Sequence, residues 1–168
     1  MEFKEIIKNR ETVRKFDGRK PSEEQLNAIL EAGRVAPTAA NKQPQRVYVL
    51  ESPEALAKMD QAHPCRYNAS TVLMVCADMA VALDYQGKNA YEVDGTIAAT
   101  HMLLAAYDAG VDTAWLGIFE PEKVQEIFDL PENMMPIAFI DLGFRTDDYK
   151  GNPSHGQKNP METMVTRL

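Results

Sequence analysis

The chain has 168 residues and a mass of 18.8 kDa, which is the size of one ordinary domain, so we expect a single domain over residues 1–168. Hydrophobic residues make up 45% and charged residues 26%, which excludes a disordered chain, a collagen-like repeat and a disulfide scaffold. The formal net charge of −7 argues against a nucleic-acid partner, because binding phosphates needs a basic face.

Membrane and secretory features are absent from the sequence. No apolar run approaches the ~20 residues that cross a bilayer, and the charged N-terminus does not resemble a secretory signal. Cys65 and Cys76 form no C-x-x-C motif, so neither a zinc site nor a redox dithiol is indicated. We therefore expect a cytoplasmic protein with no membrane partner.

Positive charge is concentrated at the start of the chain. Residues 1–20 hold seven basic and four acidic side chains, a net charge of +3, which leaves −10 for the remaining 148 residues. Such a cluster suits the binding of a small anion, and it also suits a solvated helix face. Charge patterning alone leaves both interpretations open.

Two helices are predicted before residue 35. Apolar residues at i, i+3 and i+4 predict the first, from residue 2 to about residue 8. The second begins at a capping box, in which Ser22 caps the helix and Gln25 follows three residues later. Its apolar stripe ends at Gly33, which we interpret as the stop signal.

The rest of the chain alternates between strands and helices up to residue 142. Strands are predicted at 46–50, 71–77, 112–119 and 136–142, and helices at 53–59, 93–109 and from Pro121. The helix at 93–109 is apolar almost all round and is followed by Gly110, so it belongs inside the molecule or in a subunit interface. From Gly143 onward no apolar period appears, so this tail must lie along its own domain or along a partner chain.

Several kinds of chemistry are excluded by missing motifs. The sequence has no G-x-G-x-x-G, no G-x-x-x-x-G-K and no G-x-S-x-G, and its three histidines are too dispersed for a metal site. We therefore predict no metal site. If the protein is an enzyme, an organic cofactor supplies its reactivity.

Two segments have the equipment to bind such a cofactor. In an extended stretch, period-two spacing puts Arg10, Thr12 and Arg14 on one side, where planar guanidinium groups match phosphate oxygens, although R-x-x-x-R alone occurs on many surfaces. The second segment, residues 36–44, combines small residues with the amides of Asn41 and Gln43, which suit the edge of a heterocycle. It would equally serve as a plain connecting loop.

Taken together and in this order, the motifs resemble those of the nitroreductase family of flavin enzymes. The resemblance rests on NRETVRKF, APTAANKQP, VDGTIAATHMLLAAYDAGVDTAWLGIF and NPMETMV, and it covers nearly the whole chain. It implies an α+β fold, a three-layer α/β/α sandwich around a mixed, mostly antiparallel sheet. It also implies an extended C-terminal tail that reaches the partner subunit.

The resemblance further implies FMN bound without a covalent link at the interface of a homodimer. The matching positions for the phosphate and the flavin ring are Arg10, Thr12 and Arg14, with Lys158 returning to the phosphate from the tail. The positions that match the loop from the second subunit are Pro37, Thr38, Ala39 and Asn41, and those that face the reactive edge of the flavin are Leu116 and Gly117.

The implied activity is ping-pong electron transfer from NAD(P)H through FMN to a small acceptor such as a nitroaromatic or a quinone. The chain departs from the family in three ways. Thr12 and Thr38 replace serines of the family motifs. Only residues 78–92 separate the second strand from the central helix, where longer members have additional helical structure. The basic residue that some members place near the flavin ring has no clear match in this sequence, and Arg66 is the one candidate. The short segment 78–92 implies a substrate pocket with less cover. This leaves an alternative function, an FMN-binding or storage module with little turnover.

Overall fold

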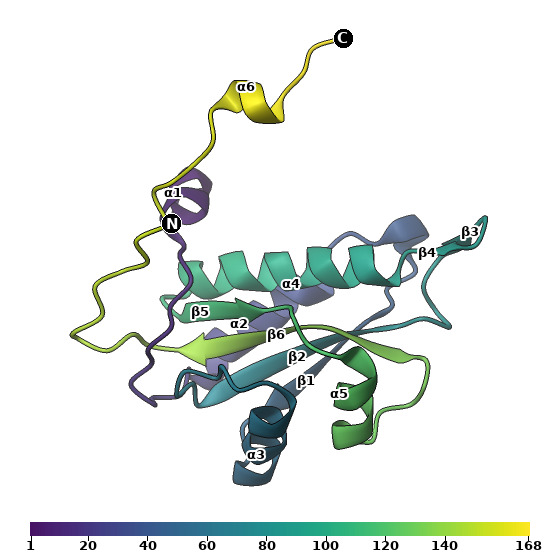
Figure 1. Cartoon of the computed structure of the whole chain (residues 1–168), viewed down its shortest axis with the longest axis horizontal. Helices are drawn as coiled ribbons and strands as arrows, with labels where there is room; N and C mark the ends of the chain where they lie inside the picture. Colours follow the sequence, from purple (N-terminus) through teal and green to yellow (C-terminus); the bar gives the residue numbers. More distant parts are fainter.

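A four-stranded sheet lies between two layers of helices in the computed structural model, which describes residues 1–168 (Figure 1). The strands lie in the order β1 (Gln45–Leu50), β2 (Thr71–Asp78), β6 (Met134–Gly143) and β5 (Asp112–Leu116), and each neighbouring pair is antiparallel. The predicted α+β sandwich is confirmed. The mixed character expected of the sheet is limited to one parallel bridge, which joins Thr12 to Thr113.

Each face of the sheet is covered by two helices. On one face, α2 (Glu23–Arg34) and α4 (Tyr91–Asp108) share an apolar cluster with residues of β2 and β6. On the other face, α3 (Pro53–Ala62) and α5 (Pro121–Phe128) pack against alternate residues of the same strands. Because successive side chains point to opposite faces, β2 is buried from Thr71 to Ala77, as its unbroken apolar run predicts.

Helix α2 begins as predicted and ends differently. Its capping box is complete, because the Ser22 hydroxyl accepts from the Gln25 backbone N–H at 3.2 Å and the Gln25 side chain accepts from the Ser22 N–H at 2.9 Å. Gly33 is not the stop signal, since the helix continues to Arg34. A Cβ at Gly33 would lie 2.8 Å from the Met102 sulfur, so this glycine permits the close approach of α2 to α4.

Helix α4 is the central helix. Its buried face includes Ala98, Ala99 and Met102, and Gly110 follows it in a left-handed conformation at φ 75°, as predicted. The structure contains no helix that is both long and apolar enough to cross a bilayer.

Strand β5 stops three residues earlier than predicted, at Leu116, and residues 117–119 leave the sheet. The remaining elements are short: α1 (Phe3–Asn9), η1 (Ala39–Asn41), the hairpin of β3 (Asp84–Tyr85) and β4 (Lys88–Asn89), and α6 (Met161–Met164). That hairpin occupies part of the short connection before the central helix.

The C-terminal tail follows β6 without regular structure until α6. Figure 1 shows it running beside the N-terminal segment and then away from the body of the protein. Its last residues, from Met161 to Leu168, are all exposed, and they include the apolar side chains of Met164 and Val165.

Candidate functional site

Residues 10–14, the arginine segment, run in an extended conformation beside β5. The Val13 N–H donates to the Thr113 carbonyl at 2.8 Å, and the Val13 side chain is fully buried. Because side chains alternate along an extended backbone, Arg10, Thr12 and Arg14 fall on the side away from Val13. The segment therefore presents two guanidinium groups and a hydroxyl together.

The two guanidinium groups of this segment have no carboxylate partner. Neither Arg10 nor Arg14 takes part in an ion pair, whereas the intervening Glu11 pairs with Arg145 at 2.7 Å. Arg10 is half-buried, and this burial lowers the pKa of its guanidinium. A half-buried cation without a counter-ion is a site for an external anion, and phosphate oxygens match the guanidinium geometry.

Residues 37–44, the polar loop, have a tightly wound backbone. Ala40, Asn41 and Gln43 all adopt positive φ angles, at 48°, 54° and 51°, which is costly for residues other than glycine. Two side chains hold this shape. The Thr38 hydroxyl accepts from the Gln43 N–H at 3.0 Å, and the Asp94 carboxylate accepts from the Ala39 N–H at 2.8 Å.

The arginine segment and the polar loop are anchored toward opposite ends of α4. Asp94 lies in the first turn of this helix, whereas the Met1 ammonium, at the start of the chain that leads into the arginine segment, bonds Asp108 in its last turn at 2.7 Å. Fourteen residues of helix span about 21 Å. The N-terminus in Figure 1 lies at the end of α4 away from β4, which precedes the helix.

Leu116 and Gly117 lie where β5 leaves the sheet. Leu116 is buried, and a Cβ at Gly117 would lie 2.6 Å from the Trp115 indole nitrogen, so a side chain has no room there. A small cavity of about 160 Å³ adjoins Gly117 and the first turn of α4. The side chain of Ile118, one residue later, is 92% exposed and is available to contact a ligand or a second chain.

One residue, His155, links Lys158 to the N-terminal part of the chain. Its ammonium donates to the His155 carbonyl at 2.6 Å, and a ring nitrogen of His155 lies 2.9 Å from the Lys8 carbonyl oxygen. Lys8 belongs to α1, whose last residue directly precedes Arg10. The tail thus brings a further cation toward the arginine segment.

These features agree with what comparison with known proteins finds. The family model described as the nitroreductase family matches residues 7–67 and 63–144. The chain belongs to the nitroreductase family. A protein of Archaeoglobus fulgidus, described as a candidate NADH dehydrogenase/NAD(P)H nitroreductase, is 30% identical over 165 residues that cover 92% of each chain.

Solved nitroreductase-family structures share the fold along the whole chain. A nitroreductase family protein from Clostridium difficile superimposes with a TM-score of 0.90 and 31% identity, over 99% of this chain and 98% of that one. A candidate nitroreductase from Exiguobacterium sibiricum, solved in complex with FMN, has a TM-score of 0.86 and 22% identity over 100% and 98% of the two chains.

Within this nitroreductase fold, Arg66 is held by contacts within its own chain. Its guanidinium forms two bonds to the Asp60 carboxylate, at 2.8 and 2.7 Å, and donates to the Ala69 carbonyl at 2.6 Å. The ion pair lowers the pKa of Asp60 and raises that of Arg66. These contacts fix the Arg66 guanidinium beside Asp60 of α3.

Three further polar side chains, of which two hold the predicted site segments, were not identified from the sequence. Asp94 is 1% exposed and fixes the polar loop, while Arg145 pairs with Glu11 beside the arginine segment. Asp141 is fully buried in β6, and neither of its carboxyl oxygens has a hydrogen-bond partner in the protein. Burial raises the pKa of Asp141 to about 8. An acidic residue inside an apolar run was the available signal for Asp94 and Asp141.

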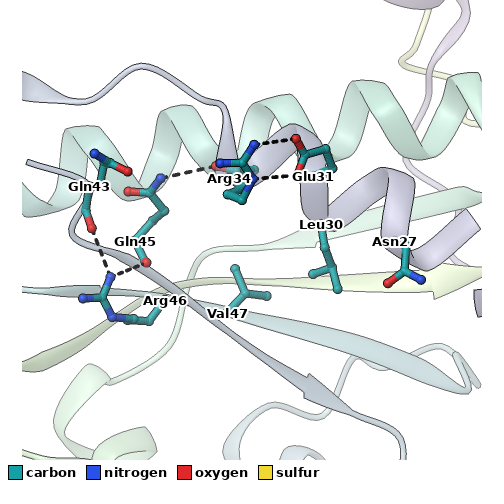
Figure 2. Close-up of a pocket in the computed structure, with 9 residues that line it drawn as sticks. Asn27, Leu30, Glu31, Arg34, Gln43, Gln45, Arg46 and Val47 are labelled. Atoms are coloured by element: carbon teal, nitrogen blue, oxygen red, sulfur yellow. Dashed lines mark hydrogen bonds and ion pairs between the residues drawn. The ribbon is translucent and has the colours of Figure 1, made fainter. Parts of the chain in front are cut away.

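A further cavity lies elsewhere, between α2 and β1. It has a volume of about 650 Å³, and none of the ten predicted site residues lines it. Figure 2 shows that both of its arginines are engaged within the protein: Arg34 pairs with Glu31, and Arg46 donates to the backbone carbonyls of Gln43 and Gln45. This groove runs along the open edge of the sheet.

Proposed function

We propose that the protein is an FMN-dependent oxidoreductase that oxidises NAD(P)H and reduces a small acceptor such as a nitroaromatic or a quinone. The observation that carries this proposal is the pair of unpaired guanidinium groups in the arginine segment of a protein with a net charge of −7. Membership in the nitroreductase family supports it, as do the printed descriptions of relatives as NAD(P)H nitroreductases. The shared fold accommodates FMN in the Exiguobacterium sibiricum protein.

The residues of the chain would bind and orient the cofactor. We assign Arg10, Thr12 and Arg14 to the phosphate and the flavin ring, and Lys158 to the phosphate. We assign Leu116 and Gly117 to the reactive edge of the flavin, at the point where the backbone leaves the sheet after β5. When bound, FMN supplies the redox chemistry, accepting a hydride from NAD(P)H and reducing the acceptor in a second half-reaction of a ping-pong cycle.

The polar loop would complete the site of a second subunit. We assign Pro37, Thr38, Ala39 and Asn41 to the flavin of the partner, because the loop and the arginine segment are anchored toward opposite ends of α4. A homodimer that shares its sites in this way brings the two segments together.

Exposed apolar side chains support a dimer. Phe3, Ile7 and Val93 are exposed on α1 and α4, and Met161 and Met164 are exposed on the tail. We propose that each chain forms one domain and that its tail reaches over the partner. Both cysteines are free thiols, which fits a reducing compartment, and we place the protein in the cytoplasm.

The decisive experiment follows the colour of the purified protein. We expect a yellow protein whose flavin absorbance is lost anaerobically on addition of NADH or NADPH and returns with a quinone. A colourless protein that cannot be reconstituted with FMN contradicts the proposal. Tight FMN binding without steady-state NAD(P)H oxidation would instead identify a storage module.

A further inference from the structure

An ion cluster joins the tail to the arginine segment. The Arg145 guanidinium donates to Asp112 through Nη2 at 2.6 Å and Nε at 3.0 Å, and to Glu11 through Nη1 at 2.7 Å. The carboxylates of Glu11 and Asp112 are only 12% and 15% exposed. Two largely buried anions thus depend on one cation, whose pKa they raise further.

The tail also holds the backbone of the arginine segment. The second oxygen of Glu11 accepts from the Asn152 N–H at 2.8 Å, and the Tyr149 hydroxyl donates to the Thr12 carbonyl at 2.9 Å. The Arg145 guanidinium lies 5.3 Å from the centre of the Tyr149 ring. These contacts occupy the Glu11 carboxylate and the Thr12 carbonyl and leave the guanidinium groups of Arg10 and Arg14 without an ion-pair partner.

Glu11 stands between the two arginines of the segment that is assigned to the phosphate and the flavin ring. An uncompensated carboxylate at this position would attract the guanidinium groups and repel a phosphate nearby. The bond to Arg145 draws this carboxylate toward β5 and the tail and offsets part of its charge, since the same guanidinium also pairs with Asp112. The arginine segment can therefore offer Arg10 and Arg14 to an external anion although it contains an acidic residue.

We propose that Arg145 is a positioning residue for FMN, which acts through Glu11 on the phosphate end of the cofactor without touching it. The proposal rests on the proposed function, because it takes the phosphate to lie at the arginine segment. It predicts that the loss of Arg145 weakens the binding of the phosphate group selectively. Riboflavin, which has the same ring and no phosphate, distinguishes this effect from general damage to the site.

The test measures the dissociation constants of FMN and riboflavin for the apoprotein by quenching of flavin fluorescence. We expect Arg145→Met to weaken FMN binding about tenfold or more and riboflavin binding less than about threefold, since charge-assisted contacts to the phosphate are lost. In Arg145→Met combined with Glu11→Gln, FMN binding should recover most of that loss, because the uncompensated carboxylate is gone. Arg34→Met, which breaks the ion pair with Glu31 on α2, is the matched control and should change neither constant.

Other outcomes separate this proposal from the proposed function. Equal weakening of FMN and riboflavin, or no change in either, overturns the positioning role. If Arg145→Met does not fold, as judged by circular dichroism, Arg145→Lys keeps the charge without the forked geometry and should show the same selective loss to a smaller extent. If the unmodified protein binds neither flavin, the proposed function itself fails. If Arg10→Ala loses FMN and Arg145→Met does not, only the positioning role fails.

Discussion

The arginine segment and the polar loop are both assigned to the cofactor, yet they are held in different ways. The arginine segment is fixed by a backbone bond to β5, a buried Val13 and an ion cluster from the tail. The polar loop is held by the Asp94 carboxylate and the Thr38 hydroxyl, and three of its residues adopt positive φ angles. The arginine segment is therefore stabilised by β5 and by the C-terminal tail of its own chain. The polar loop is stabilised by α4, the helix proposed to lie at the subunit interface.

The largest effect is expected from Asp141, which lies in β6 opposite Ala114, a neighbour of Val13 in the core. The pKa of its carboxyl group is about 8 in the folded protein and near 4 in the unfolded chain. Unfolding therefore releases a proton at any pH between these two values. Stability should therefore fall as pH rises, by about 1.4 kcal/mol per pH unit, or about 4 kcal/mol from pH 5 to pH 8. Asp141→Asn should remove this slope.

Urea denaturation of the apoprotein at several pH values measures this pH dependence of the free energy of unfolding. Asp147→Asn, at an exposed position, is the control and should keep the slope of the unmodified protein. An Asp141→Asn variant with an unchanged pH dependence would show that Asp141 is ionised in the folded state.

Replacing Arg10 tests the arginine segment directly. Arg10→Ala should weaken FMN binding by about 1.5 to 3 kcal/mol, because it removes a charge-assisted bond to the phosphate. Titration of the apoprotein with FMN gives the dissociation constant, with Arg34→Ala as the control on an exposed arginine. An unaltered constant would remove Arg10 from the site.

Replacing Asp94 tests the polar loop. Asp94→Ala should weaken FMN binding by about 1 to 2 kcal/mol, since Ala39 loses its anchor and the strained backbone relaxes. Glu92→Ala, at an exposed position in the same turn of α4, should have no effect.

Mixed dimers sharpen the comparison between the two segments. If each site takes the arginine segment from one chain and the polar loop from the other, a dimer of Arg10→Ala with Asp94→Ala chains contains one intact site. Purified mixed dimers should then bind one FMN with the affinity of the unmodified protein. Loss of tight binding at both sites would place the two segments in the same site of one chain.

The smallest effect is expected outside both segments. Ser22→Ala removes the cap of α2 and should lower the free energy of unfolding by about 1 kcal/mol without changing FMN binding. Thermal denaturation measures the first effect. A change in flavin affinity would show that α2 also contributes to the site.

Local chemistry made parts of the fold predictable. The capping box at Ser22 and the unbroken apolar run of β2 each depend on neighbouring residues, so the sequence alone indicates them. The predicted end of β5 was wrong. Residues 117–119 have side chains that suit a strand, but the strand ends at Leu116 and these residues leave the sheet. Gly33 looks like a stop signal until its distance from Met102 is known.

The predicted site residues depend on local sequence, whereas the side chains that hold them in place depend on distant parts of the chain. Arg10, Thr12 and Arg14 could be grouped from their spacing, because an extended backbone alternates its side chains. The roles of Asp94 and Arg145 depend on partners 55 and 134 residues away in the chain. No periodicity reveals such pairs, and only the folded structure brings them into contact.

The Thr12–Thr113 bridge and the Glu11–Arg145 pair also determine when the arginine segment takes shape during folding. Both contacts join parts of the chain more than 100 residues apart, so the loops they close are long and their formation follows that of the central sheet. The segment can also reopen while the sheet stays intact. The Val13 amide should then exchange its hydrogen faster than the amides of β2, and bound FMN should slow this exchange by holding the two ends of the chain closed.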